Sequence, residues 1–241
     1  MPDSLPPVGV GRIVGLWRYP VKSMAGEALP EVGVSWHGFA GDRRWAFVRQ
    51  EAAGSGFPWL TLRNCGDLAL YRPSLVDPER PDRSDTVVRT PGGSVLDVMD
   101  PAFAAELSTT PVWPIKQDRG VFDTFPLSLI TTQTISRLAE TVGLPLAVER
   151  FRPNFLLEAF DAAEFPEDRW VGRSLRIGSL RLRVDKRDGR CVVITLDPVT
   201  AEREPKILRA VASDRQGCLG VYASTVEPGT VALGDAVYLE G

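Results

Sequence analysis

The sequence predicts a mainly β (α+β) fold with a few short helices. One reason is that 20 prolines and 22 glycines divide the 241 residues into short segments. Another is that several of these segments alternate apolar and polar residues, as half-buried strands do. The composition of 44% hydrophobic and 24% charged residues is typical of a folded chain with a substantial core. At this length the chain forms one large domain or two closely packed ones.

The strand pattern is clearest in residues 173–185. Leu175 and Ile177 share one face, and Gly178-Ser179 then shifts the alternation to a new phase that begins at Leu180. The shift predicts a bulge or a turn between two strands. Near the carboxyl end, the apolar alternation on both sides of Gly234-Asp235 predicts a tight hairpin.

Two helices are predicted. The apolar stripe of the clearer one consists of Ile135, Leu138, Ala139 and Val142. Thr131 or Thr132 caps its start, and Gly143 and Pro145 end it. A second helix covers about residues 204–212. The segment QDRGVFDTFP at 117–126 is expected to join two halves of the chain.

Charge and targeting signals narrow the function. The net charge of −3 gives no indication of a nucleic-acid or membrane partner, so any basic site must be local. The amino-terminal residues lack a signal-peptide pattern, and there is no run of 18 apolar residues. We therefore expect a cytoplasmic protein.

The rarity of histidine and cysteine excludes several kinds of site. His37 is the only histidine, which argues against zinc protease motifs, histidine-based triads and the two-histidine iron site. Cys65, Cys191 and Cys218 are widely spaced and odd in number, which favours reduced thiols over a disulfide framework. The glycines of GVGRIVG at 9–15 have the wrong spacing for a nicotinamide-binding loop.

Two motifs in the amino-terminal half carry positive charge. In YPVKS at 19–23, Lys22 and Ser23 follow a proline at the end of a strand and could hold an anion, although a solvated turn explains them equally well. In GFAGDRRWAFV at 38–48, the Asp42-Arg43 pair is more often a structural ion pair than part of a site.

A third motif, WLTLRN at 59–64, alternates like a strand. Thr61 and Arg63 would then point to one side, opposite Leu60 and Leu62. An exposed strand face accounts for this pattern as well as a ligand site does.

Further anion-binding groups are expected around residues 131–154. In RFRPN, Arg152 precedes a proline, which predicts an extended backbone, and offers a planar donor fork near Asn154. The free backbone N–H groups after Thr131, at the start of the predicted helix, could also bind an anion.

The most informative motif is DGRCVVITLDPVT at 188–200. Cys191 begins a β-branched run, which predicts the entrance of a strand, and it stands beside Arg190. A nearby cation favours the thiolate, the form that acts as nucleophile or soft metal ligand. The alternative is a small core residue, and this alternative is preferred for Cys65 and Cys218.

Taken in order, these motifs resemble MOSC-domain proteins of the type that includes the mitochondrial amidoxime-reducing component. The resemblance implies two packed β-barrel-like units, with an N-terminal MOSC β-barrel domain at residues 8–120 and a MOSC domain at 121–241. The motifs that carry it are IVGLWRYPVKSMAG, GDRRWAFV, WLTLR, RFRPNFLLEAF, EDRWVGRSLRIG, GRCVVITLDPVT and LGVYASTVEPGTVALGDAVYL.

The resemblance also implies a cofactor and a chemistry. Cys191 would supply a thiolate to molybdenum in a molybdenum cofactor, the metal complex of molybdopterin. Pyridoxal phosphate binding is only a general label of the family. The residues that would hold the phosphate and pterin of the molybdenum cofactor are Lys22, Ser23, Arg43, Thr61, Arg63, Thr131, Arg152 and Asn154.

The expected activity is reduction of N-hydroxylated or other N- or S-oxygenated small molecules. Because the chain has no cysteine cluster of its own, electrons would come from a separate donor protein, either ferredoxin-like or a reductase. A first alternative is a non-catalytic carrier of molybdenum cofactor or sulfur on Cys191. A second is a biosynthetic enzyme on the same scaffold without molybdenum.

Overall fold

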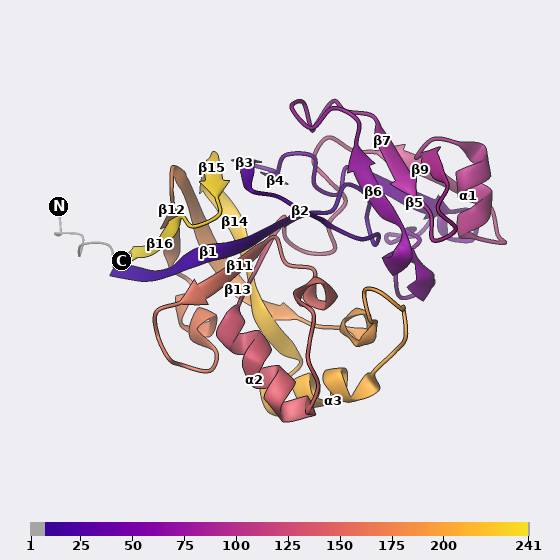
Figure 1. Cartoon of the computed structure of the whole chain (residues 1–241). Helices are drawn as coiled ribbons and strands as arrows, with labels where there is room; N and C mark the ends of the chain where they lie inside the picture. The colour runs from indigo at the N-terminus through magenta and orange to yellow at the C-terminus, as the bar shows by residue number, and fades with distance from the viewer. Residues whose placement is uncertain (1–7, 241) are drawn as a thin grey trace.

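The computed structural model describes residues 8–240. Its central element is a closed barrel of seven strands, in which β1 pairs with both β11 and β16 and so joins the two edges of the sheet. In pairing order the barrel strands are β11 (Phe155–Ala159), β10 (Leu127–Thr131), β14 (Cys218–Glu227), β13 (Leu180–Gly189), β12 (Ser174–Ile177), β16 (Ala236–Glu240) and β1 (Val8–Arg18). The prediction of a mainly β fold is confirmed (Figure 1).

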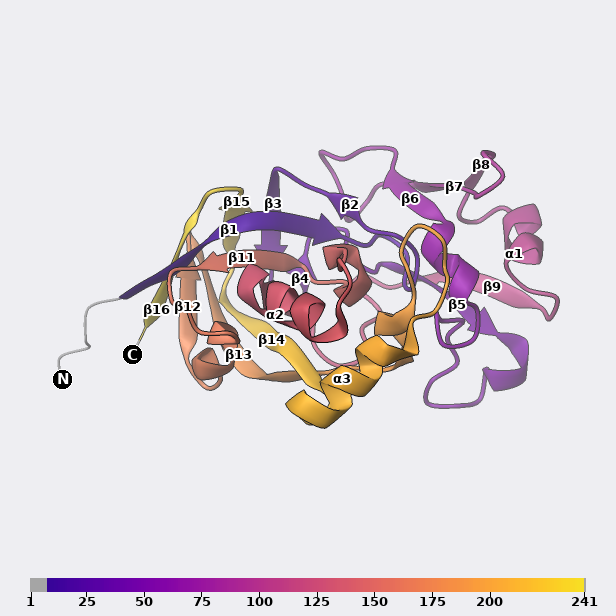
Figure 2. The same ribbon diagram turned by 60° about the horizontal axis from the view of Figure 1, so that its bottom comes forward.

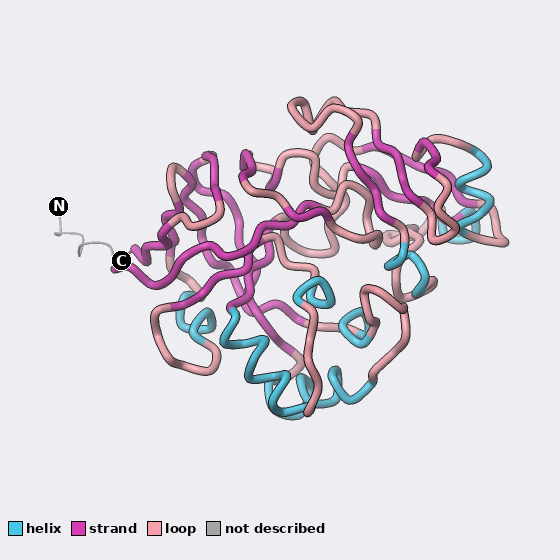
Figure 3. Tube along the Cα trace, viewed as in Figure 1, coloured by secondary structure: helices cyan, strands magenta, loops and turns pink. Residues whose placement is uncertain are grey.

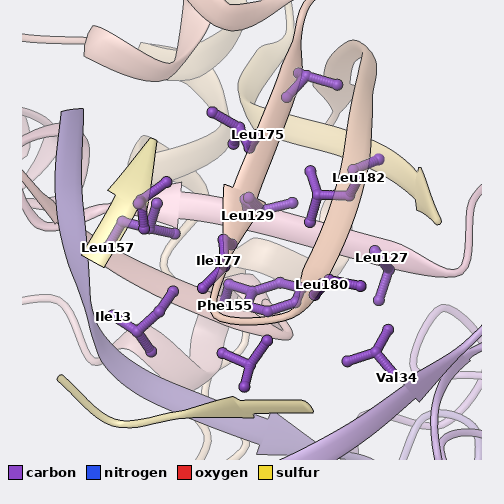
Figure 4. Packing of buried hydrophobic residues seen from close by; sticks show 14 of the residues in the cluster. Ile13, Val34, Leu127, Leu129, Phe155, Leu157, Leu175, Ile177, Leu180 and Leu182 are labelled. Carbon is purple, nitrogen blue, oxygen red and sulfur yellow. The ribbon is translucent and has the colours of Figure 1, made fainter. Parts of the chain in front are cut away.

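The barrel strands share one apolar core. Figure 4 shows Leu129, Leu157 and Ile177 converging there from different strands. Phe155 meets Phe39 edge to face, with ring centroids 4.8 Å apart. A three-stranded sheet contributes further side chains to this core, and its strands are β15 (Gly229–Ala232), β3 (Glu31–Ser35) and β4 (Gly38–Phe39).

A second core lies among strands from the first half of the chain. Phe103 stands at its centre, with ring centroids 5.6 Å from Phe47 and 5.8 Å from Tyr71. These elements lie to the right of the barrel in Figures 1 and 3. They are β5 (Trp45–Arg49), β9 (Val112–Lys116), β6 (Arg72–Leu75), β7 (Thr86–Arg89), β8 (Val95–Asp97), α1 (Pro101–Leu107) and the 3₁₀ helices η1 (Gln50–Ala52) and η2 (Gly66–Leu70).

The barrel and the elements around the second core are not separate in the chain. Strand β1, from the start of the chain, belongs to the barrel, and the short β2 (Glu27–Ala28) pairs with it. The domain boundary near residue 120 stays a prediction.

Helices α2 (Thr132–Val142) and α3 (Pro205–Arg215) lie side by side in Figure 2 and share a third apolar cluster. The 3₁₀ helices η3 (Val148–Phe151) and η5 (Val192–Thr195) contribute to it, whereas η4 (Pro166–Trp170) lies elsewhere. Both predicted helices are confirmed, and the Thr131 cap and the left-handed Gly143 bound α2 as expected. Helix α1 was not predicted from the sequence. Within residues 8–240, no helix is long and apolar enough to cross a membrane.

The two strand-pair predictions have different outcomes. Gly178-Ser179 forms the turn between β12 and β13, which pair directly, so that prediction is confirmed. The hairpin at Gly234-Asp235 is wrong, because β15 pairs with β3 while β16 pairs with β12 and β1. A turn is present, but it bonds to β1: the Gly234 N–H donates to the Ile13 carbonyl at 2.8 Å, and the Ile13 N–H donates to the Asp235 carbonyl at 2.9 Å.

The barrel closure predicts a strong difference between two glycines of β1. A Cβ at Gly11 would lie 2.6 Å from the backbone oxygen of Glu158, whereas one at Gly9 would have its nearest atom at 3.8 Å. We expect Gly11→Ala to lower the free energy of unfolding by roughly 1–3 kcal/mol, because the neighbouring strand must move. Gly9→Ala should cost less than about 0.5 kcal/mol. Urea denaturation of both variants measures the difference, and equal stabilities would contradict this account of the closure.

Candidate functional site

A cavity of about 190 Å³ is lined by residues from both halves of the chain. It brings together eight of the nine predicted site residues, which are Lys22, Ser23, Arg43, Thr61, Arg63, Arg152, Asn154 and Cys191. Thr131 is the predicted residue that does not line it. The four predicted cations thus meet in one place, although the chain has a net charge of −3.

Cys191 lies between the end of β13 and the start of η5, and it is half-buried. The predicted strand after it is wrong, because Val192–Thr195 form a 3₁₀ turn in which the Thr195 hydroxyl donates to the Val192 carbonyl at 2.7 Å. Arg63 lines the cavity together with this thiol and with Arg190. The Arg190 guanidinium donates to the Leu219 and Phe151 carbonyls.

Arg63 and Lys22 share one counterion. The Asp123 carboxylate accepts from Arg63 Nη2 at 2.9 Å and forms a close ion pair with Lys22 Nζ. Burial opposes the charge of Arg63, but the Cys191 sulfur and Asp123 outweigh it and raise the Arg63 pKa. Burial of the ammonium lowers the Lys22 pKa, and Asp123 offsets part of that effect. Both cations therefore line the cavity and share the Asp123 carboxylate.

Thr61 and Arg63 reach the cavity from a turn, not from the predicted strand. Only Trp59 makes a β-bridge, to Val48. The Thr61 hydroxyl accepts from the Arg63 backbone N–H at 3.3 Å and contacts Asn64 Oδ1 at 3.1 Å. These side-chain to backbone bonds compete with strand pairing and fold the segment back.

The opposite wall of the cavity is built on Tyr19. The guanidinium groups of Arg152 and Arg43 both stack on the Tyr19 ring, with their Cζ atoms 4.4 Å and 4.6 Å from the ring centroid. Desolvation, together with the nearby Arg43, lowers the Arg152 pKa to about 10, so the group is still charged at neutral pH. Beneath them, the fully buried Asp42 pairs with Arg43 and accepts from Asn154 Nδ2 at 3.1 Å.

The Arg152 backbone is not extended as predicted. Its φ of 53° and ψ of 44° are left-handed, because its N–H caps η3 and its Nη1 donates to the Met24 carbonyl at 2.7 Å. Ser23 and Arg43 also have positive φ values of 69° and 50°. Three lining residues with this uncommon conformation indicate that the fold imposes the cavity's shape, as it does at many functional sites.

Thr131 has a structural environment. It is fully buried, its hydroxyl donates to Glu167 Oε2 at 2.8 Å, and its oxygen accepts from the Thr134 N–H at 3.3 Å. Burial raises the pKa of Glu167, which receives a second hydroxyl bond from Thr134. The cofactor-binding role assigned to Thr131 stays a prediction, without support from its position.

Several lining residues were not predicted from the sequence. Asp123, Phe122 and Phe125 belong to the segment interpreted only as a junction, where a carboxylate between two aromatics was a usable signal. Asp188 stands three residues before Cys191 and is almost fully buried. Its carboxylate accepts from Ser128 Oγ at 3.1 Å and pairs with Arg190 at 3.0 Å. No local pattern indicated Tyr222, which β14 carries to the same place.

The donor set fits a molybdenum–pterin group better than a bare metal ion. Within residues 8–240, no three His, Cys, Asp or Glu side chains gather to hold a metal. One soft thiol can bind a metal only if another molecule supplies most of the ligands. Arg152 Nη2 is buried and has no hydrogen-bond partner in the described part of the chain. Such an orphaned donor suits an anionic or heterocyclic ligand.

Two family models match the chain. The model described as "MOSC domain" matches residues 116–238, and the one described as "MOSC N-terminal beta barrel domain" matches residues 10–123. Human "Mitochondrial amidoxime-reducing component 1" is 24% identical over 96% of this chain and 84% of the human protein. "Molybdenum cofactor sulfurase" of Drosophila grimshawi is 24% identical over 88% of this chain. The chain spans only 32% of that sulfurase.

A solved structure shares the fold. The crystal structure of the YUAD protein from Bacillus subtilis superposes with a TM-score of 0.55 and covers 96% of both chains. Its sequence is 13% identical, so this similarity supports the fold alone.

The surroundings of Thr131 predict a stability effect. Thr131→Ala removes a donor from the buried Glu167 and the cap of α2, so it should lower the free energy of unfolding by roughly 1–3 kcal/mol. Thr132→Ala is the matched control, because that hydroxyl contacts only the neighbouring Gln133, and it should cost less than about 0.5 kcal/mol. Urea denaturation gives both values. If Thr131→Ala kept full stability but lost bound cofactor, the role inferred from the sequence would be correct.

Proposed function

We propose that this chain, which belongs to the MOSC-domain family, binds molybdenum cofactor around Cys191 and reduces N-hydroxylated or other N- or S-oxygenated small molecules. The observation that carries the proposal is the convergence of a half-buried thiol and six cationic side chains, four of them predicted from the sequence, on one cavity. The relatives' names support a function related to molybdenum cofactor, and that of the human protein supports reduction of amidoximes.

The protein's part in this function is binding and orientation. Cys191 would supply the sulfur that binds a soft metal, and Arg63 lines the same cavity. Lys22 and Arg63 would take the cofactor's phosphate, while Arg43 and Arg152 would present planar donor forks to the phosphate or the pterin. When bound, the molybdenum cofactor supplies two-electron chemistry, and a separate ferredoxin-like protein or reductase supplies the electrons.

The sulfurase relative favours a second candidate, in which Cys191 carries the cofactor or its sulfur to another protein. This candidate needs the same thiol and cations but no substrate. A scaffold enzyme without molybdenum is a third, and metal analysis alone would reject or establish it. Protein purified from a host that makes the cofactor should contain molybdenum and pterin at about one per chain if either of the first two is right.

Replacing Cys191 tests the enzyme. Wild-type protein should reduce an amidoxime or a hydroxylamine with a chemical electron donor, and Cys191→Ser should fold but lose that activity. Cys65→Ser and Cys218→Ser are matched controls, because both thiols are also half-buried, and they should keep most of the activity. A molybdenum-containing wild type that reduces none of these compounds but transfers its cofactor to an apo-enzyme would instead establish the carrier.

Replacing Arg152 tests whether the cations of the cavity hold the cofactor. Charge-assisted hydrogen bonds contribute roughly 1.5–3 kcal/mol each, so Arg152→Gln should retain cofactor at least about tenfold less well. Arg209→Gln, on the exposed side of α3, controls for the loss of one positive charge. Circular dichroism checks the fold, because Arg152 also bonds to Met24. Unchanged cofactor content in Arg152→Gln would contradict the proposed binding mode.

A further inference from the structure

Asp123 is a feature of the cavity that the proposed function leaves unexplained. A site that binds an anion has no evident need for a carboxylate, yet Asp123 joins Lys22 and Arg63 through its two oxygens. Together the two cations lower the pKa of this carboxylate despite its partial burial, so it is fully charged at neutral pH. Two cations that would receive the cofactor's phosphate are therefore already paired with one carboxylate of the chain itself.

The two cations have other supports. Lys22 is 7% exposed and also donates to the Val121 carbonyl at 3.0 Å. The Arg63 backbone N–H donates to the Thr61 hydroxyl at 3.3 Å, which holds its segment at the cavity. The Phe57 ring centroid lies 5.6 Å from the charged group of each. Removal of the Asp123 carboxylate would thus leave both donors in the cavity.

Asp123 itself is free to turn away. Its side chain is 36% exposed, so part of the carboxylate already contacts water. It belongs to the segment between β9 and β10, which contains no helix or strand and includes Gly120 at a φ of 75°. A rotation of one side chain in such a segment breaks both ion pairs without disturbing a core.

We propose that Asp123 is an intramolecular competitor, which must release Lys22 and Arg63 before an anionic ligand can take them. The inference rests on the proposed function only for the identity of that ligand. Competition of this kind divides the affinity for every anion that uses the pair by the same factor. Small cellular anions then bind too weakly to occupy the cavity. A larger ligand that also reaches Arg152 and Cys191 still binds.

The test uses cofactor-free protein and inorganic phosphate as the probe. Calorimetric titration at low ionic strength and pH 7 compares the wild type with Asp123→Asn and Asp118→Asn. Asp118 is exposed in the same segment, so both variants lose one negative charge. We expect Asp123→Asn to bind phosphate about tenfold more tightly and Asp118→Asn to change by less than about twofold. Adding Lys22→Met to Asp123→Asn should abolish the gain.

Other outcomes would overturn the proposal. Equal gains in both variants would indicate a general field effect, and weaker binding in Asp123→Asn would mean that Asp123 positions the cations. Absence of phosphate binding in every form would mean that the pair does not accept anions. Asp123→Glu, which keeps the charge, should bind as weakly as the wild type, and circular dichroism verifies that each variant folds. Molybdenum content is measured separately, so the competitor and the proposed function can fail independently.

Discussion

The buried carboxylate of Asp42 is the constraint on which the site depends. It is fully buried, and an ionised carboxylate in such a position must be paired and hydrogen-bonded. Asp42 meets this requirement by accepting from the Tyr19 backbone N–H at 2.7 Å and from Asn154, and by pairing with Arg43. One side chain thus ties the segment after β1, the segment before β5 and the segment before β11. Tyr19 is thereby fixed as the platform for two guanidinium groups.

The pairing of acids and bases explains how a chain of net charge −3 contains a basic cavity. Most cavity cations have a counterion at the rim or behind the wall, such as Asp123 for Lys22 and Asp197 for Arg150. Arg152 differs, because a carbonyl and an aromatic ring support it instead of a carboxylate. The overall composition therefore says little about the site. The local partners of each cation determine which cation can still bind an anionic ligand.

The sequence predicted local features well where neighbouring residues decide the structure. The turn at Gly178-Ser179 follows from its glycine, and the limits of α2 follow from its capping residues and from the spacing of its apolar residues. All of these signals act within a few residues. The Gly234-Asp235 hairpin and the extended Arg152 were wrong because distant partners decide them. These partners are the β1 backbone for the hairpin, and Met24 and Tyr19 for Arg152. Eight of the site residues were found from motifs and Asp123 had a local signal that was not used, but Tyr222 became visible only in three dimensions.

The dual pairing of β1 also governs when the barrel can form. Val8 pairs with Leu239, and Gly11 pairs with Ala159 on the other edge. During synthesis the first barrel strand therefore has no complete set of neighbours until residues 236–240 have left the ribosome. Loop-closure entropy on this scale makes such non-local pairing slow. Until residues 155–159 have been made, β1 can pair only with the short β2, and it presents alternating apolar side chains without their final neighbours.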